Sequence, residues 1–220
     1  TRDSATWYGK LTPEQQRELR ERTELRFSPH NSTQFQPDAE VTLDVEIKRV
    51  DQLIVRVYEL NALSFYRNSQ EHLGTDVDLD GLVANSEQTL NFSVPADRRH
   101  TETLQLPTLM GRGVWIVDLL GAGTRCRALI QKGSLTPLER LGDSGQVFRI
   151  VDEAGKPRPA AHLELLGQTY LPNQQGEITL PYAEQTVRRK VLLVEERLAV
   201  PVTITHRSES YELQARFLLD

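Results

Sequence analysis

Residues 114–133, VWIVDLLGAGTRCRALIQKG, contain two apolar segments separated by a short turn that holds two glycines. Gly121 and Gly123 supply the positive φ angles that tight turns between strands require. The segment before the turn is rich in Val and Ile, which favour strands because their branched side chains pack well on a pleated surface. The stretch therefore predicts a β-hairpin whose turn lies at residues 121–124.

The same strand signal recurs on both sides of this hairpin. In residues 40–48, Val41, Leu43, Val45 and Ile47 alternate with polar residues, which is the pattern of a half-buried strand. Short strand-like segments separated by turn sequences indicate two consecutive immunoglobulin- or fibronectin-III-like antiparallel β-sandwiches, an all-β fold. The remaining expected strands cover residues 52–60, 89–94, 101–106, 114–120, 125–133, 146–152, 161–167, 177–182, 190–196, 199–206 and 211–219.

One short helix is expected near the start of the chain. Thr12 suits the N-cap, Pro13 the first helical position, and Glu14 the positive end of the helix dipole. These signals predict a surface or linker helix over about residues 13–23. We therefore divide the chain into a helical segment at 1–23, a sandwich at 24–133 and a second sandwich at 134–220. Each sandwich is close to the ~100 residues of an immunoglobulin-like domain.

Composition excludes several classes of protein. The chain has 220 residues, with 26 Lys and Arg against 31 Asp and Glu, so its net charge is −5. This charge offers no basic field for nucleic acid, and no apolar run approaches the ~20 residues of a membrane-spanning helix. The single Cys126 excludes an internal disulfide and a multi-cysteine metal site. Because the sequence does not begin with Met, we expect it to be a piece of a larger protein.

The sharpest motif match is an acidic segment at residues 75–87, TDVDLDGLVANSE. Asp76, Asp78, Asp80, Gly81 and Glu87 satisfy the spacing of an EF-hand calcium loop. The context opposes this interpretation, because an EF-hand needs a helix on each side and the residues after Glu87 alternate like a strand. We expect a structural loop whose apolar residues tuck into a core, and a calcium site is the alternative. Those apolar residues are Val77, Leu79, Leu82 and Val83.

Other segments resemble catalytic motifs only in part. GDSG at residues 142–145 and the histidine segment ending at His162 resemble parts of chymotrypsin-like proteases in reversed order, so a turn containing Ser144 is favoured. Cys126 is expected to be a small core residue, although Arg125 and Arg127 flank it. The five histidines show no zinc-ligand spacing. They are His30, His72, His100, His162 and His206. We therefore assign no catalytic, cofactor-binding or metal-binding residue.

Residues 114–184 resemble the junction of two macroglobulin-like domains in the α2-macroglobulin family. The matching features are the second hairpin strand at 127–133, the VDEAGKP turn at 151–157 and the segment from Tyr170 to the Gly-Glu-Ile-Thr-Leu-Pro run at 176–181. The segments at 27–31, 55–68 and 75–85 fit the preceding domain, so the resemblance covers residues 24–220. The turn features of the second half are shared with prealbumin-like and carboxypeptidase-regulatory domains.

The resemblance implies a scaffold rather than a catalyst. The family's Cys-Gly-Glu-Gln thioester is absent, since Arg127 and Ala128 follow Cys126. It implies a non-catalytic structural or protein-interaction module, such as a protease-inhibitor scaffold, with neighbouring domains of the same polypeptide or another protein as partners. It also implies a secreted, periplasmic or cell-envelope location and no cofactor. The alternatives are a calcium-dependent adhesion module that uses residues 76–87, and an enzyme whose groups are scattered along the chain.

Overall fold

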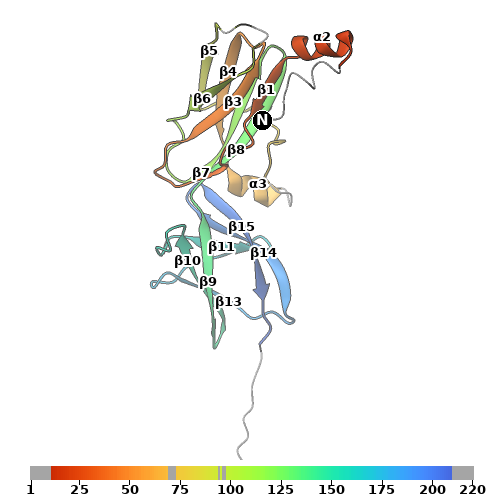
Figure 1. Ribbon diagram of the computed structural model, residues 1–220. Coiled ribbons are helices and arrows are strands. Elements are labelled where there is room, and N and C mark those ends of the chain that lie inside the picture. The colour runs from red at the N-terminus through yellow and green to blue at the C-terminus, as the bar shows by residue number, and fades with distance from the viewer. Residues whose placement is uncertain (1–10, 69–72, 94, 96–97, 210–220) are drawn as a thin grey trace, which may run out of the picture. The chain divides into compact units, whose positions relative to one another are not determined.

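The computed structural model describes residues 11–68, 73–93, 95 and 98–209 (Figure 1). These residues divide into two compact units. One unit contains the described residues up to 61 and those between 73 and 132. The other contains residues 62–68 and 133–209. The expected strand at 211–219 and His72 lie outside the described residues.

The first unit is a sandwich of two sheets, as the sequence predicts. A three-stranded antiparallel sheet has the order β1-β3-β6 and a five-stranded sheet has the order β2-β8-β7-β4-β5. Among the described strands of this unit, only the β2–β8 pair is parallel. The three-stranded sheet comprises β1 (Glu24–Phe27), β3 (Thr42–Lys48) and β6 (His100–Gln105). The five-stranded sheet comprises β2 (Gln34–Phe35), β8 (Thr124–Lys132), β7 (Gly113–Gly121), β4 (Gln52–Glu59) and β5 (Ser86–Asn91).

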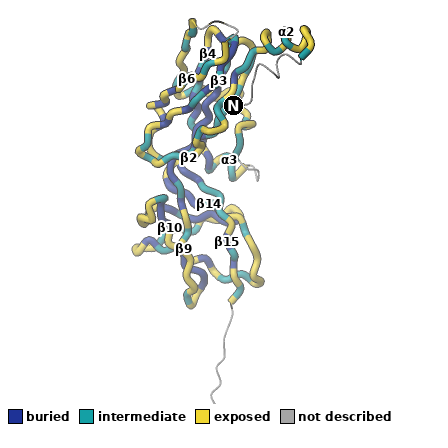
Figure 2. Tube along the Cα trace, in the orientation of Figure 1, coloured by how far each residue is buried: buried dark blue, intermediate teal, exposed yellow. Residues whose placement is uncertain are grey.

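The core of the first unit lies between these sheets (Figure 2). Val45 of β3 and Val57 of β4 belong to it, and both are buried as their strand periodicity predicts. Central strand β7 is buried on both faces, because Val117 belongs to the core while Ile116 is buried on the opposite face. That opposite face of β7 also carries Asp118.

The β7–β8 hairpin turns at the predicted residues, but its positive φ angles belong to Ala122 and Gly123 and not to Gly121. Gly121 pairs with Thr124, and the two residues between them, Ala122 and Gly123, have φ angles of 47° and 75°. Two positive φ values define the type I′ turn, whose twist matches that of the flanking strands. The turn fixes the register of the hairpin, and therefore determines which side chains of β7 and β8 lie opposite each other.

Helix α2 (Pro13–Glu21) begins where predicted and ends two residues earlier than expected. Thr12 and Gln15 form a reciprocal capping box at its start. Arg22 is already extended, and β1 begins at Glu24. The ammonium group of Lys48 donates to the carbonyl of Leu19, which places a cation at the negative end of the helix. None of the helical residues is buried, so α2 lies on the surface of the first unit.

In the described residues, the second unit is a sandwich of seven strands with one short helix. Its sheets have the orders β13-β10-β9 and β12-β11-β14-β15, and all pairs are antiparallel. Ile150 of β10 is buried as expected, and Phe148, Leu163 and Leu193 are fully enclosed with it. The elements are α3 (Ala62–Asn68), β9 (Leu135–Gly142), β10 (Gly145–Asp152), β11 (His162–Leu165), β12 (Gln168–Tyr170), β13 (Glu177–Leu180), β14 (Val187–Glu195) and β15 (Leu198–His206).

Three of these elements were not expected: α3, β9 and the three-residue strand β12. Strand β9 has the sequence LTPLERLG, which lacks apolar alternation and contains Pro137, and it lies at the edge of its sheet where proline is tolerated. Helix α3 follows directly on a strand-like segment of the first unit but belongs to the second. In the described part of the chain, no helix is long and apolar enough to cross a membrane.

Candidate functional site

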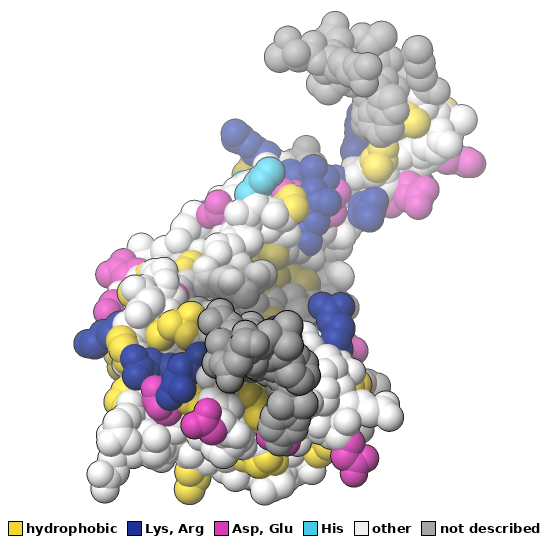
Figure 3. Space-filling view, turned by 90° about the horizontal axis from the view of Figure 1, so that it is seen from below, with side chains coloured by type: hydrophobic (Ala, Val, Ile, Leu, Met, Phe, Trp, Pro, Cys, Tyr) yellow, Lys and Arg dark blue, Asp and Glu magenta, His cyan; other side chains and the backbone are white. Residues whose placement is uncertain are grey.

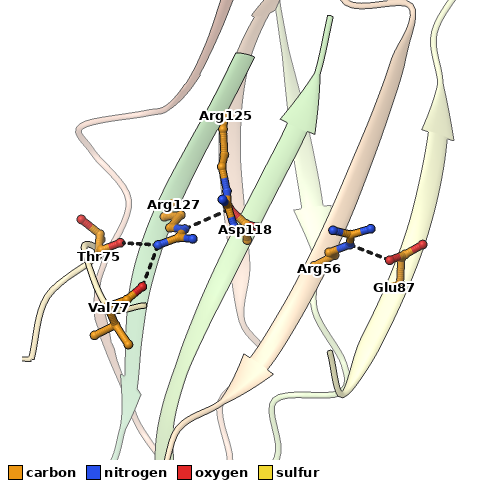
Figure 4. Close-up of polar contacts among 7 residues, drawn as sticks. All are labelled: Arg56, Thr75, Val77, Glu87, Asp118, Arg125 and Arg127. Carbon is orange, nitrogen blue, oxygen red and sulfur yellow. Dashed lines mark hydrogen bonds and ion pairs between the residues drawn. The ribbon is translucent and has the colours of Figure 1, made fainter. Parts of the chain in front are cut away.

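A row of alternating charges crosses the outer face of the five-stranded sheet. By strand register, Glu87 of β5 lies opposite Arg56 of β4, Arg56 opposite Asp118 of β7, and Asp118 opposite Arg127 of β8. Figure 4 shows these side chains on neighbouring strands, with Arg125 beside Asp118. Directly opposed residues of a sheet lie close enough for their side chains to interact. Two ionic groups result: an exposed pair of Glu87 with Arg56, and beside it a cluster of Asp118 with Arg125 and Arg127.

Asp118 is the centre of this cluster, and its side chain is fully buried. Arg125 donates from Nε and Nη2 to the two carboxylate oxygens, at 2.7 Å each, and Arg127 donates from Nε to Oδ1 at 3.2 Å. The hydrogen bonds to Asp118 raise the pKa of the Arg125 guanidinium. A buried carboxylate is tolerable only when it is paired and hydrogen-bonded, and these two arginines satisfy that requirement.

Arg127 also anchors the acidic loop that resembles a calcium site. Its Nη1 donates to the backbone carbonyls of Val77, at 2.8 Å, and Thr75, at 3.3 Å (Figure 4). Within the loop, Oδ1 of Asp78 accepts from the backbone N–H of Asp80 at 2.9 Å. The loop is therefore attached to the sheet by a side chain that binds its carbonyl oxygens.

The two ends of this loop differ from those of an EF-hand. Helix α3 ends at Asn68, and β5 begins at Ser86, so Glu87 lies in a strand, where it accepts from Arg56 at 2.6 Å. In the described residues, no group of three or more His, Cys, Asp or Glu side chains could hold a metal ion. The expectation that the apolar residues of the loop are buried is correct for Leu79 and wrong for Leu82 and Val83, which are 50% and 90% exposed.

The residues of the partial protease motif lie on different sheets. Ser144 lies in the two-residue turn between Gly142 of β9 and Gly145 of β10, which is the turn that the sequence favours. His162 begins β11 in the other sheet of the unit, and its Nε2 lies 3.7 Å from Glu164. Ser144 and His162 therefore belong to different sheets of the second unit.

The other described histidines and Cys126 contact neighbouring residues of the fold or lie in a turn. His206 is buried, with its Nε2 2.8 Å from the carbonyl oxygen of Pro181. The ring of His100 packs edge-on against Phe92 at 5.6 Å, and His30 is exposed in a turn. Cys126 packs partly buried against the core of the first unit, and burial raises the pKa of its thiol to about 11. This thiol is protonated at neutral pH, which is unfavourable for a nucleophile.

A second charged region lies in the second unit, around a cavity of about 710 Å³. Buried Glu164 accepts from Nε of Arg67 at 3.1 Å and from a second nitrogen of that guanidinium. Arg188, Arg189 and Lys190 of β14 line the same cavity. Figure 3 shows charged side chains of both signs among hydrophobic ones on the face of the second unit that is turned to the viewer.

Asp118 and Glu164, the buried carboxylates of the two charged regions, belong to none of the sequence motifs. The signal was available for Asp118, because a hairpin turn at 121–124 places residue 118 directly opposite residue 127. Glu164 offers no such signal, since its partner Arg67 is 97 positions away along the chain. Such a pair is formed only by the tertiary fold.

Comparison with known proteins gives two kinds of similarity. Residues 53–133 match the family model described as the AbpF first immunoglobulin-like domain. Over 210 residues, the chain is 28% identical to Actin-binding protein F of Dictyostelium discoideum, a match that covers 92% of this chain. The chain spans only 9% of the length of that relative.

A solved structure of part of Escherichia coli α2-macroglobulin has a similar fold. The structure spanning domains MG0-NIE-MG1 aligns with a TM-score of 0.50 and 14% identity, covering 83% of this chain and 64% of the other. The structure spanning NIE-MG1 aligns with a TM-score of 0.48 and 16% identity, covering 84% and 97%. The chain is a tandem of immunoglobulin-like sandwiches with a macroglobulin-type fold. At 14% identity the first of these likenesses shows the fold alone, and it confirms the fold that the family resemblance implies.

Proposed function

We propose that this chain is a non-catalytic, protein-binding module of a longer polypeptide. One observation carries the proposal. In the described residues, each of the eight buried polar or charged side chains binds a partner inside its own unit. These side chains are Lys48, Asp118, Lys132, Gln146, Asp152, Glu164, Glu195 and His206.

The partners of these groups are structural ones. Lys132 donates from Nζ to the carbonyls of Ala39, at 2.8 Å, and Leu109, at 2.6 Å, and so joins two loops of the first unit. Arg158 donates from Nε to both carboxylate oxygens of Glu195 at 2.8 Å. Catalytic acids, bases and nucleophiles must reach a substrate with a proton or an electron pair available. Buried polar side chains that are bound to partners within the fold support a structural role for this chain.

A module of this kind acts through its surface. Sandwich domains of longer proteins make contacts with neighbouring domains or other chains through loops and sheet edges. The match to Actin-binding protein F runs through both sandwiches. We include filamentous actin in the proposal as the partner, because the name of that relative states actin binding. The extracytoplasmic location implied by the macroglobulin resemblance is not part of the proposal.

Co-sedimentation with filamentous actin tests this function. The folded chain is mixed with increasing amounts of filaments and centrifuged, and the chain centrifuged without filaments is the control. Saturable pelleting that excess unlabelled chain competes away is the expected result. Pelleting that rises linearly without saturation, or none at micromolar filament concentrations, would overturn actin as the partner.

A further inference from the structure

We infer that the second unit binds an extended acidic peptide beside the open part of β14. This inference rests on the proposed protein-binding function and names the chemistry of a partner. It is carried by an unfilled strand edge, by the charges around it and by the cavity that adjoins it.

The unfilled edge results from the unequal lengths of the strands. β14 has nine residues and pairs along its whole length with β15, from Val187 opposite His206 to Glu195 opposite Leu198. On its other side it pairs only with the four-residue strand β11, between Glu164 opposite Leu192 and His162 opposite Val194. Residues 187–191 therefore have a strand neighbour on one side only.

No strand of the described chain pairs with the open side of this segment. β11 ends at Leu165 and turns through Leu166 and Gly167 into β12. No backbone hydrogen bond of the described residues joins Arg188, Arg189 or Lys190 to a segment other than β15. In a strand, alternate N–H and C=O groups point to either side, so this segment presents unused donors and acceptors. Such an edge can pair with an added strand.

The charges beside this edge favour an acidic ligand. The cavity is lined by four cationic side chains, Arg67, Arg188, Arg189 and Lys190, and by one carboxylate, Glu164. Three positive charges remain after Glu164 is paired, although the whole chain carries a net charge of −5. Nε of Arg189 is buried and has no hydrogen-bond partner among the described residues. By the period of two, Arg189 lies on the inner face of β14 with Val191, so the carboxylates of a ligand would meet Arg188 and Lys190 instead.

The side chains on the outer face of β14 are spaced as a strand ligand requires. Leu192 lies opposite Glu164, so these residues share a face with Arg188 and Lys190. On that face Nζ of Lys190 lies 5.6 Å from the ring centre of Tyr66, and Arg67 binds Glu164. The period of two along a paired strand would bring alternate acidic residues of a ligand opposite Arg188 and Lys190.

The size of the site and its apolar rim also favour a peptide. A cavity of about 710 Å³ is larger than a single phosphate or carboxylate requires. Leu166, at the end of β11, lines it and is 79% exposed, so it can cover an apolar side chain of the ligand. Three consecutive cations disfavour pairing with the same edge of a second copy, because like charges would meet. The occupant that satisfies both the edge and the charge is an acidic strand.

Fluorescence anisotropy with a labelled heptapeptide tests the inference. The probe alternates glutamate with threonine, and the control peptide has glutamine in place of glutamate. The full chain is expected to bind the glutamate peptide at low salt and not the glutamine peptide. Binding should weaken as salt is added, since the contacts are ionic and partly exposed. Equal binding of both peptides, or of neither, would overturn the inference.

Two matched double variants locate the site. Arg188→Glu with Lys190→Glu should weaken binding about tenfold or more, because two ion pairs become repulsions. Arg22→Glu with Arg98→Glu changes the net charge equally in the first unit and should leave binding unchanged. If both double variants weaken binding alike, the site is not at β14. Since Arg188 and Lys190 are exposed, both variants are expected to fold, and their melting temperatures verify this.

Hydrogen exchange distinguishes an added strand from a small-anion site. Peptide binding should slow exchange of amides within residues 187–191. Unchanged exchange, or displacement of the peptide by inorganic phosphate at the peptide's own concentration, would indicate a small-anion site and overturn strand addition. The outcome is independent of actin. Peptide binding without actin pelleting would reject only the actin partner, and actin pelleting without peptide binding would reject only this inference.

Discussion

Arg125 binds both carboxylate oxygens of fully buried Asp118, with two hydrogen bonds of 2.7 Å. The two residues lie on adjacent strands of the hairpin that defines the fold, seven positions apart. This fork-to-fork geometry is the strongest form of a side-chain ion pair. It holds a charge inside central strand β7, whose other residues are apolar or glycine.

The pair predicts unequal losses of stability when its two sides are removed. Asp118→Asn leaves arginines that can reach water, because the side chain of Arg125 is 45% exposed, and should cost about 2 kcal/mol. Arg125→Met with Arg127→Met leaves a buried carboxylate without a cation and should cost about 3–5 kcal/mol. Urea unfolding measures both. Arg56→Met, which breaks only the exposed pair with Glu87, is the control and should change stability little. Equal losses for the two Asp118-cluster variants would contradict this account.

The acidic loop at residues 75–87 is expected to be independent of calcium. Arg127 binds the carbonyls of Val77 and Thr75, and Glu87 pairs with Arg56. A ligand that binds only the folded state must raise the melting temperature by mass action. Melting scans with excess EDTA and with millimolar calcium should therefore coincide. A rise with calcium that Asp78→Asn with Asp80→Asn abolishes would show a metal site instead.

The sequence predicts most of the strands, but not the ion pairs around Asp118. Strand alternation correctly identifies β3 and the burial of Val45, Val57 and Ile150, because one buried face imposes a period of two. Ile116 is buried as well, but on the face of β7 opposite the core, because β7 is covered on both faces. Edge strand β9 does not follow this rule, since seven of its eight residues are exposed or half-exposed and the strand has no repeating apolar face. Helix α3 is not predicted by apolar periodicity either, because only one of its seven side chains, that of Ala62, is buried. A short helix that is fixed mainly by an ion pair and ring contacts leaves little periodic signal.

The thiol of Cys126 is expected to react slowly and with a steep dependence on pH. Burial raises its pKa from 9.0 to about 11, so the reactive thiolate at pH 8 is about a hundredfold scarcer than in an unperturbed cysteine. Alkylation by iodoacetamide should accelerate about tenfold for each pH unit until the pH approaches that pKa. Labelling followed by mass spectrometry measures the rate, and the chain unfolded in urea is the control. A native rate equal to the unfolded rate at pH 8 would show that the thiol is not protected.

Separation of the two units should reveal the role of α3. We predict that a fragment comprising residues 134–220 folds by itself, because it holds both sheets of the second sandwich. It lacks Arg67, which lowers the pKa of Glu164 in the full chain chiefly by hydrogen bonding. In the full chain this pairing stabilises the fold above the ordinary carboxyl pKa, and the contribution is lost as the pH falls through the lowered pKa.

The fragment should show the opposite dependence on pH. Without Arg67, burial disfavours the charged form of Glu164 and raises its pKa, so acidification from pH 7 to pH 5 should stabilise this site. Glu164→Gln removes the charge and should stabilise the fragment at pH 7 while destabilising the full chain, where it breaks the pair with Arg67. Urea unfolding of the four proteins at both pH values measures this reversal. A fragment that is molten would reject a domain boundary near Ser134, and a Gln variant with the same sign of effect in both backgrounds would reject the role assigned to α3.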